Sequence, residues 1–303
     1  MKNLKWFASF VLAAIPVSAL TAETRCPGNV ASVPLRFVNH YQMIVGVSVN
    51  GSGPYSFLLD TGTQFTIIDP SLAAELHLST QGAALIAAVG SNDPASFAQL
   101  DRLEISSHAV ENLQVLVFEL QKMKSVELQI RGILGEDFLE HFDMLIDNAH
   151  GMLCLDDAAA MRPGLKGTHI PLLTSQTTEG APAAKSLIID VHFFSGMRPV
   201  RMMLDSGTNT PFLYKPTECL EIGVLQGASW HGRGVGGQQE AFVALPPQDM
   251  KIGNAALSKV PFLALRNERK ELHAAAYDGL LPTGLFRRVF VSQSAEFAIL
   301  ELR

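Results

Sequence analysis

The sequence Phe57-Leu58-Leu59-Asp60-Thr61-Gly62-Thr63 recurs 145 residues later, with few changes of character, as Met202-Met203-Leu204-Asp205-Ser206-Gly207-Thr208. In both copies three apolar residues lead into an acid, and the four residues that begin with the acid differ only by Thr for Ser. One Asp-Thr/Ser-Gly tripeptide is typical of an ordinary turn. Two at equivalent places indicate a duplicated unit, which is the first feature to look for before assigning a fold.

The duplication extends beyond these two stretches. Upstream, the apolar or alternating run 44–51 is matched by 189–196, and each run ends at a Gly turn. Downstream, the pattern predicts further strands over 65–68 and 212–214, each followed by a short helix that begins at a proline, Pro70 or Pro216.

The parallel continues to the ends of both halves. Gly132-Ile133-Leu134-Gly135 and Gly279-Leu280-Leu281-Pro282 correspond after a two-residue slip, and pairs of apolar strands follow each of them (144–146 and 152–155; 289–291 and 297–300). We therefore predict an all-β protein with two pseudo-twofold-related lobes and a few short helices. The lobes are placed at 30–163 and 164–303, with the boundary near 161–164 or in the turn-forming stretch 174–182.

The first 22 residues are predicted to be a secretory signal peptide. Lys2 and Lys5 precede an apolar run over 6–15, Pro16 interrupts it, and small residues follow up to Ala22. The run is too short to span a bilayer, and no later apolar stretch is long enough. We therefore expect export to the periplasm or the extracellular space without a stable membrane anchor.

Composition excludes several classes of protein. The chain has 303 residues, of which 48% are hydrophobic, so it can bury a large core and is not disordered. With 23 Lys and Arg against 29 Asp and Glu it offers no basic surface for nucleic acid. The spacing Gly232, Gly234, Gly237 matches a dinucleotide loop, but prolines at 246–247 cut short any helix after it, and a turn is the better interpretation.

Three cysteines allow at most one intramolecular disulfide. Cys154 lies in an apolar strand and is interpreted as a small core residue, with a bridge to Cys26 as the alternative. Cys219 lies in the helix predicted after Pro216. The sequence leaves the pairing open. No Cys-x-x-Cys or His-Glu-x-x-His motif points to a metal.

The two acids have a chemical reason to be where they are. An acid at the end of a buried strand is costly to ionise unless its environment has a function. If the pseudo-twofold brings Asp60 and Asp205 to about 3 Å, two negative charges would repel by roughly 5 kcal/mol at an effective dielectric of about 20. The pair is then expected to hold one proton, so that one carboxylate activates a water and the other carboxyl hydrogen-bonds to the carbonyl under attack.

Neighbouring residues are expected to support this pair. Gly62 and Gly207 allow sharp turns and a close approach of the loops. The hydroxyls of Thr61 and Ser206 are expected to tie the loops together through backbone groups, and those of Thr63 and Thr208 to donate to the carboxylates. The reaction that this arrangement suits is amide hydrolysis, and it requires no metal, cofactor or covalent intermediate.

These motifs resemble the two active-site loops of the aspartic proteases, and the likeness runs from about Val33 to the end of the chain. The short lobes and the motif at 132–139 resemble a tandem fusion of the retropepsin-like branch more than pepsin. The resemblance implies Asp60 and Asp205 as the catalytic pair and an extended peptide bound in the cleft. It also implies a flap hairpin after each loop, with candidate turns at Gly90-Ser91 and Gly236-Gly237.

Two departures from the family are visible in the sequence. No Tyr lies between 78 and 103, so the flap tyrosine typical of pepsins is missing, and Pro282 stands where the first lobe has Gly135. We predict a monomeric aspartic endopeptidase acting on extended peptides or proteins. The alternatives are an inactive peptide-binding or scaffold protein with the same fold, and lobes that pair between chains.

Overall fold

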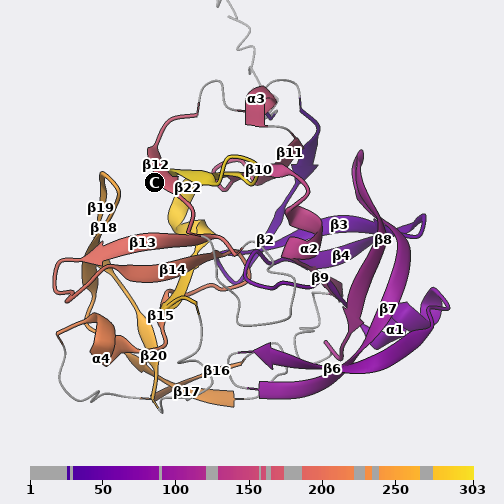
Figure 1. The fold of residues 1–303 in the computed structure, drawn as a ribbon, viewed down its shortest axis with the longest axis horizontal. Helices are drawn as coiled ribbons and strands as arrows, with labels where there is room; N and C mark the ends of the chain where they lie inside the picture. The colour runs from indigo at the N-terminus through magenta and orange to yellow at the C-terminus, as the bar shows by residue number, and fades with distance from the viewer. Residues whose placement is uncertain are drawn as a thin grey trace, which may run out of the picture.

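The computed structural model describes residues 26–27, 30–88, 91–120, 129–156, 158–161, 165–173, 186–221, 229–233, 239–266 and 276–303. Three β-sheets make up most of this part of the chain, and the helices are short (Figure 1). One sheet belongs to each half of the chain, and the third combines strands from both. The predicted all-β class with two β-rich lobes is confirmed.

The first lobe is an eight-stranded sheet in the order β2-β3-β4-β9-β5-β8-β7-β6. The strands are β2 (Arg36–Val38), β3 (Gln42–Val49), β4 (Ser52–Leu59), β5 (Ile67–Ile68), β6 (Thr80–Ala88), β7 (Ser91–Ile105), β8 (His108–Val117) and β9 (Ile130–Leu134). A further pairing of β3 with β7, Ser48 opposite Glu104, folds the sheet back on itself like a barrel. Helix α1 (Pro70–Glu75) follows β5 and is capped by the Asp69 side chain, as the Asp-Pro signal predicts.

The second lobe is a nine-stranded sheet in the order β16-β17-β20-β15-β21-β14-β13-β18-β19. The strands are β13 (Ile188–Phe193), β14 (Val200–Asp205), β15 (Phe212–Leu213), β16 (Ser229–Arg233), β17 (Gln239–Ala244), β18 (Gln248–Ile252), β19 (Ala255–Val260), β20 (Leu263–Leu265) and β21 (Gly279–Pro282). Helix α4 (Pro216–Cys219) follows β15. The predicted order of strand, loop, short strand and helix is therefore present in both lobes.

The third sheet joins the two halves, in the order β1-β11-β10-β22-β23-β12. Its strands are β1 (Ser32–Pro34), β10 (Asp143–Asp147), β11 (Met152–Asp156), β12 (Thr168–Pro171), β22 (Phe286–Ser292) and β23 (Phe297–Leu302). The sequence pattern predicts these strands as the last strands of two separate lobes. In the structure β10 pairs with β22, with Leu145 opposite Phe290, so the last hairpins of the two halves form one continuous sheet. Figure 1 shows this sheet at the top, between the lobes.

Side chains from this central sheet reach both lobes at equivalent places. Asn148, after β10, donates to the carbonyls of Thr283 and Phe286, at 3.0 and 3.1 Å. Gln293, after β22, donates to the Glu136 carboxyl at 3.2 Å. Glu136 opens helix α2 (Glu136–Leu139), and Thr283 opens the 3₁₀ turn η4 (Thr283–Leu285). Each half therefore holds the short helix of the other, which fixes the lobes to one support.

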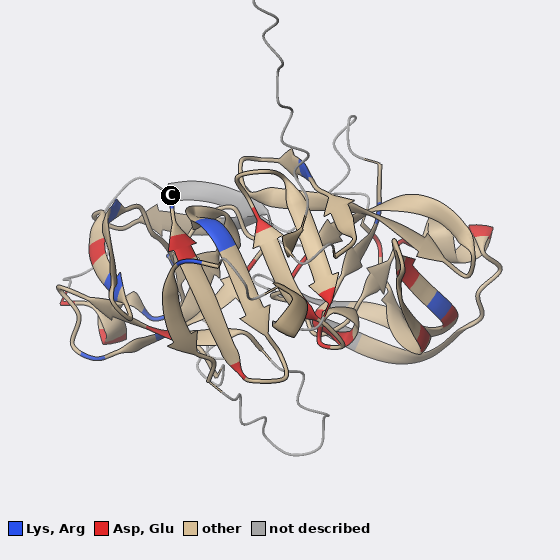
Figure 2. Cartoon of the chain, turned by 90° about the horizontal axis from the view of Figure 1, so that it is seen from above, with Lys and Arg blue, Asp and Glu red and all other residues tan. Residues whose placement is uncertain are grey.

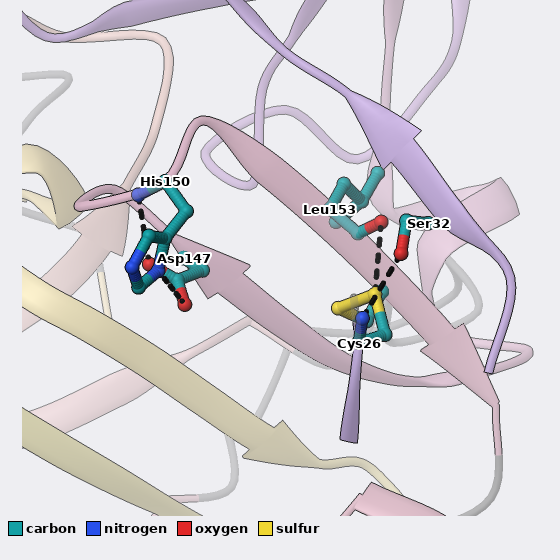
Figure 3. The surroundings of a disulfide bond; sticks show 6 residues. Cys26, Ser32, Asp147, His150 and Leu153 are labelled. Carbon is teal, nitrogen blue, oxygen red and sulfur yellow. Dashed lines mark hydrogen bonds and ion pairs between the residues drawn. A yellow bond between two sulfur atoms is a disulfide. The ribbon is translucent and has the colours of Figure 1, made fainter. Parts of the chain in front are cut away.

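The N-terminal part of the described chain is bonded to the same sheet (Figure 3). Cys26 forms a disulfide with Cys154 of β11, and the Cys26 N–H donates to the Ser32 hydroxyl at 2.9 Å. Of the two interpretations of Cys154, the bridge to Cys26 is therefore the correct one. Cys219 is a buried free thiol in α4. Helix α3 (Ala158–Met161) lies beside this end of the sheet.

The predicted signal peptide lies outside the described residues, as does the predicted lobe boundary at 163–164. Both stay predictions. Within the described ranges, none of the helices has the length and apolar character needed to cross a bilayer. Seen from above, acidic and basic residues are interspersed over both lobes (Figure 2).

Candidate active site

Each lobe places its acid at the end of a strand that lies in the middle of its sheet. Asp60 directly follows β4 and Asp205 ends β14, and these strands pair in parallel with β9 and β21. The Asp60 N–H donates to the Leu134 carbonyl at 3.0 Å, so the register of β9 fixes where the first acid emerges. The apolar triplets before the acids are buried, which leaves the acids as the first polar side chains at the ends of the strands.

The two loops interlock through their hydroxyl residues. The Thr61 hydroxyl donates to the Leu204 carbonyl at 2.8 Å and accepts from the Ser206 N–H at 3.0 Å. In the same way, the Ser206 hydroxyl donates to the Leu59 carbonyl at 2.8 Å and accepts from the Thr61 N–H at 3.0 Å. All these groups are buried, so losing one partner would leave another unsatisfied. The predicted tie between the loops is therefore present and has twofold symmetry.

The glycines of the two loops lie against the opposite acids. A Cβ atom at Gly62 would stand 2.7 Å from Cγ of Asp205, and one at Gly207 would stand 2.4 Å from Cγ of Asp60. Real Cβ contacts are longer than this, so no side chain fits at either place. The absence of side chains at 62 and 207 is what allows the carboxyls to meet.

The two carboxyls are buried and hydrogen-bonded to each other. The Gly62 N–H donates to Asp60 at 2.9 Å, and the Gly207 and Thr208 N–H groups donate to Asp205 at 2.7 and 3.0 Å. Burial outweighs these donors and raises the pKa of both acids. The charge of Asp60 raises the pKa of Asp205 further, so the two acids hold one proton as a coupled pair.

The hydroxyls of Thr63 and Thr208 do not donate to the carboxylates, which corrects the expectation from the sequence. The Thr63 hydroxyl donates to the Phe65 carbonyl at 3.4 Å, and the Thr208 hydroxyl donates to the Thr210 carbonyl at 3.2 Å. Each hydroxyl has one proton and uses it within its own turn, so it has none left for a carboxylate. It is the backbone N–H of Thr208 that reaches Asp205.

The support beneath the loops differs between the lobes. In the first lobe Asp137 accepts from the Thr66 N–H and hydroxyl at 2.8 and 2.6 Å, and the Gly135 N–H donates to the same hydroxyl at 3.1 Å. In the second lobe the three equivalent positions hold Pro211, Pro282 and Gly284. None of these can make the equivalent side-chain contacts, and Pro282 lacks the N–H. The departure noted at Pro282 is therefore part of a wider loss of polar support.

A first-lobe residue that the sequence analysis missed gives the second loop a polar contact. Gln42, at the start of β3, donates to the Gly207 carbonyl at 2.6 Å and accepts from the Asn39 side chain at 2.9 Å. The neighbouring Tyr41 packs against Gly284, where a Cβ would come within 2.6 Å of its ring. In the sequence, the role of Gln42 is indicated only by its position as a polar residue at the start of an apolar strand. That position does not predict which group Gln42 binds.

Glu136 is a second buried acid close to the pair. Its N–H donates to the Thr63 carbonyl at 2.9 Å, and one of its carboxyl oxygens is buried without a hydrogen-bond partner among the described residues. Burial raises its pKa well above the usual range, and the charges of Glu140, Asp60 and Asp137 add to the effect. Glu136 therefore holds its proton more tightly than an ordinary glutamic acid, at the base of the first loop.

The two predicted flaps fall on hairpins. Strands β6 and β7 pair with Ala88 opposite Ser91, so Ser91 lies at the tip of a hairpin, whereas Gly90 lies outside the described residues. Strands β16 and β17 form the corresponding hairpin, and its turn, with Gly236 and Gly237, is also outside the described residues. A contact of these turns with substrate stays a prediction. No set of three or more His, Cys, Asp or Glu side chains in the described ranges is placed to hold a metal ion.

Comparison with known proteins agrees with this geometry. The profile of the aspartyl protease family matches residues 45–138, which include the first loop. A search of curated proteins found no match. Among solved structures, an aspartic proteinase from Irpex lacteus is similar over 90% of this chain and 97% of its own, with 13% identity and a TM-score of 0.50. This similarity shows the fold of both lobes.

A retropepsin-like aspartic protease from Rickettsia conorii also matches, over 42% of this chain and 90% of its own, with 21% identity and a TM-score of 0.32. The family profile covers the first loop, and the Irpex lacteus structure shares the two-lobed fold over most of the chain. Residues 45–138 are therefore similar in sequence to the aspartyl protease family, and the chain has the fold of a two-lobed aspartic proteinase.

Proposed function

We propose that the protein is an aspartic endopeptidase that cleaves extended peptides with Asp60 and Asp205. The observation that carries this proposal is the reciprocal interlock of the loops, which holds two buried, hydrogen-bonded carboxyls with one proton between them. A pair that only stabilised the fold would not need to be acidic, because two buried acids cost folding energy.

In the proposed reaction the ionised Asp60 takes a proton from a bound water while the water oxygen attacks the peptide carbonyl carbon. The proton of Asp205 moves to the carbonyl oxygen as the tetrahedral diol forms. The proton now on Asp60 is then transferred to the amide nitrogen, the C–N bond breaks, and a diol proton returns to Asp205. The pair ends as it began, with Asp60 ionised and Asp205 protonated.

The hairpins β6–β7 and β16–β17 follow the two acid loops in chain order, which supports a role for them as flaps. We propose that an extended peptide binds between them and the acids, pairing its backbone with the strands. Because one chain supplies both acids, a monomer is sufficient. Export is supported by the Cys26–Cys154 disulfide, since such bonds persist in oxidising compartments.

The test is cleavage of a mixed peptide library, read by mass spectrometry, with wild type, Asp60→Asn and Asp205→Asn. We expect each substitution to lower kcat by more than about 10³-fold, because neither half of the acid–base exchange works alone. Asp101→Asn, at an exposed acid on β7, is the matched control and should leave cleavage unchanged. Folded wild type that binds peptides but never cleaves them would instead identify an inactive binding protein.

The dependence of kcat/KM on pH should be bell-shaped. At low pH Asp60 takes up a second proton and loses its basicity, and at high pH Asp205 loses the shared proton. Because burial raises the pKa of both acids, both limbs should lie above the pKa of a free aspartic acid, with an optimum on the mildly acidic side. Initial rates with one peptide between pH 3 and 8 test this, and a flat profile over that range would contradict the mechanism.

A further inference from the structure

One peptide unit of the second loop makes two contacts, one with each lobe. The Gly207 carbonyl accepts from the Gln42 side chain at 2.6 Å, and the Thr208 N–H donates to the Asp205 carboxyl at 3.0 Å. Both groups belong to the peptide unit that joins residues 207 and 208. Because a peptide unit is planar, its C=O and N–H point in opposite directions and turn together. Turning this carbonyl away from Gln42 would therefore also turn the N–H away from Asp205.

The Gln42 side chain is itself held by a hydrogen bond. The Asn39 side chain donates to the amide oxygen of Gln42 at 2.9 Å, so the amide nitrogen of Gln42 faces the second loop. A carbonyl can only accept, so this is the orientation that the Gly207 carbonyl requires. An amide that accepts at its oxygen also donates more strongly at its nitrogen, because hydrogen bonds in a chain polarise one another. Asn39, Gln42 and the peptide unit at 207–208 therefore form one chain of hydrogen bonds that ends at Asp205.

The turn that leads into β3 has an unusual backbone. Asn39 and His40 have φ angles of 46° and 74°, in the left-handed region that residues other than glycine rarely adopt. Such a conformation costs energy and persists only where the surrounding contacts hold it. Tyr41 supplies contacts of this kind, because its ring packs against Gly284 of the second lobe and the Arg303 guanidinium lies 5.7 Å from the ring centroid. The turn is therefore held in place by contacts on both sides of Tyr41.

The duplication does not repeat this chain of hydrogen bonds for the first loop. At the offset of 145 residues that relates the two loops, the position equivalent to Gln42 is Leu187, whose side chain has no donor. The first loop instead rests on Asp137, which accepts from the N–H and the hydroxyl of Thr66 in the same lobe. The second loop therefore takes a polar support from the opposite lobe, and that support acts on the peptide unit next to its acid.

We propose that Gln42 is a positioning residue that acts on Asp205 through the peptide unit at 207–208. Asn39 belongs to the same device, because it orients the Gln42 amide. The inference rests on the proposed function and adds that a side chain of the first lobe controls the acid of the second. A hydrogen bond donated to a carboxylate favours its ionised form. Without the Thr208 N–H, Asp205 would therefore hold the shared proton more tightly.

The proposed mechanism gives the sign of the effect on the pH dependence of cleavage. At the upper limb of the kcat/KM profile the pair of acids loses its shared proton. Removing the donor of Gln42 should move this limb to higher pH by about 0.5–1 pH unit, the worth of one hydrogen bond expressed on the pH scale. We expect kcat to fall about three- to tenfold and KM to stay unchanged, because the proposed contact is with the loop and not with the peptide.

The test compares two variants of the full chain, singly and combined, by their kcat/KM profiles against pH. Gln42→Met keeps the length of the side chain and removes the donor. Asn39→Gly removes the supporting amide and keeps a positive φ that glycine adopts without strain. The upper limb should move most in Gln42→Met and less in Asn39→Gly, which should have no further effect once residue 42 is changed. Gln114→Met, at an exposed position on β8, is the matched control and should not move it.

A second measurement separates this inference from the proposed function, because it needs no cleavage. Hydrogen exchange of single backbone N–H groups is followed by NMR in wild type and in Gln42→Met. The Thr208 N–H should exchange about tenfold faster in the variant, whereas the Gly62 N–H, which donates to Asp60 in the first loop, should exchange at the wild-type rate. This result supports the role of Gln42 even if the wild type proves inactive.

Three outcomes would overturn the inference. The first is a Thr208 N–H and an upper limb that are both unchanged in Gln42→Met. The second is a change in KM alone, which would make Gln42 a contact of the substrate. The third is equal acceleration of exchange at Gly62 and Thr208, which would show a general loosening of the fold. If Gln42→Met does not fold, Asn39→Gly decides by the same measurements, because the Asn39 side chain is exposed.

Discussion

At the scale of single residues, the glycines of the two loops determine whether the carboxyls can meet. An added methyl group at Gly207 would overlap the Asp60 carboxyl, because its Cβ would lie 2.4 Å from Cγ. Gly46, exposed on β3, is the matched control, since a Cβ there would meet the Pro54 side chain at an ordinary 3.4 Å.

We therefore predict that Gly207→Ala lowers kcat more than about 100-fold and lowers the free energy of unfolding by about 1–3 kcal/mol, the range for overpacking a close contact. Gly46→Ala should leave kcat unchanged. Peptide cleavage and chemical denaturation measure the two effects. Full activity in Gly207→Ala would mean that the acids do not act together as described.

Gln42 is a second residue whose role follows from a contact between lobes. Its side chain donates to the Gly207 carbonyl at 2.6 Å, and removing it leaves a polar group of the second loop without this partner.

We predict that Gln42→Ala lowers kcat about three- to tenfold and stability by about 1–2 kcal/mol, because the loss acts on the loop that touches Asp60. Gln99→Ala, at an exposed position on β7, serves as the control and should change neither. Kinetics and thermal unfolding of the two variants provide the comparison. If Gln42→Ala changed KM alone, Gln42 would be a substrate contact and not a support for the loop.

At the scale of elements, helix α2 supports the first loop through a carboxyl that has no counterpart in the second lobe. Asp137 accepts two hydrogen bonds from Thr66, and its burial raises its pKa to about 6. In the unfolded chain the same group titrates near 3.8. Between these two values the folded state holds more protons than the unfolded state, so its stability falls as pH rises.

We predict that the difference in unfolding free energy between wild type and Asp137→Asn depends on pH. From pH 3.5 to pH 6.5 the wild type should lose about 2–3 kcal/mol relative to the variant, and the difference should be constant at higher pH. Urea denaturation at several pH values measures it. A gain in wild-type stability with pH relative to Asp137→Asn would show that Asp137 is ionised in the folded state at low pH.

At the scale of the whole molecule, the sheet shared by the two halves carries the disulfide. Cys26 and Cys154 are 128 residues apart in the sequence, and their bond closes a long loop onto β11. Cross-links of this length restrict the unfolded chain strongly.

We predict that Cys26→Ser together with Cys154→Ser lowers the free energy of unfolding by about 3–5 kcal/mol. Reductant should lower the Tm of wild type but not that of the double variant. At temperatures where the double variant stays folded, kcat should be unchanged, because the bond does not touch the acids. Cys219→Ala is the control for loss of a thiol without loss of the bridge, and an unchanged Tm in the double variant would show that the bond contributes nothing to stability.

Much of this architecture could be predicted from the sequence, because local patterns carry it. The recurrence of Asp-Thr/Ser-Gly after apolar triplets gave the duplication and the two acids, and prolines gave the starts of α1 and α4. Thr61 and Ser206 could be assigned because a hydroxyl in a tight turn has few partners other than backbone groups.

Contacts between the halves could not be predicted in the same way. Strands β10 and β22 have the same apolar pattern whether they pair within a lobe or with each other, and Gln42 has no local partner that would reveal its bond to Gly207. The choice between Cys26–Cys154 and other pairings depends on distances across the fold.

Two equivalent β lobes, each with an acid at the end of a buried strand, can thus be predicted from sequence, because side-chain alternation and turn chemistry are properties of neighbouring residues. How the lobes are joined, and that two buried acids meet and share a proton, follow only from the tertiary structure. Those outcomes depend on burial and on groups more than a hundred residues apart, and no local pattern records either of them.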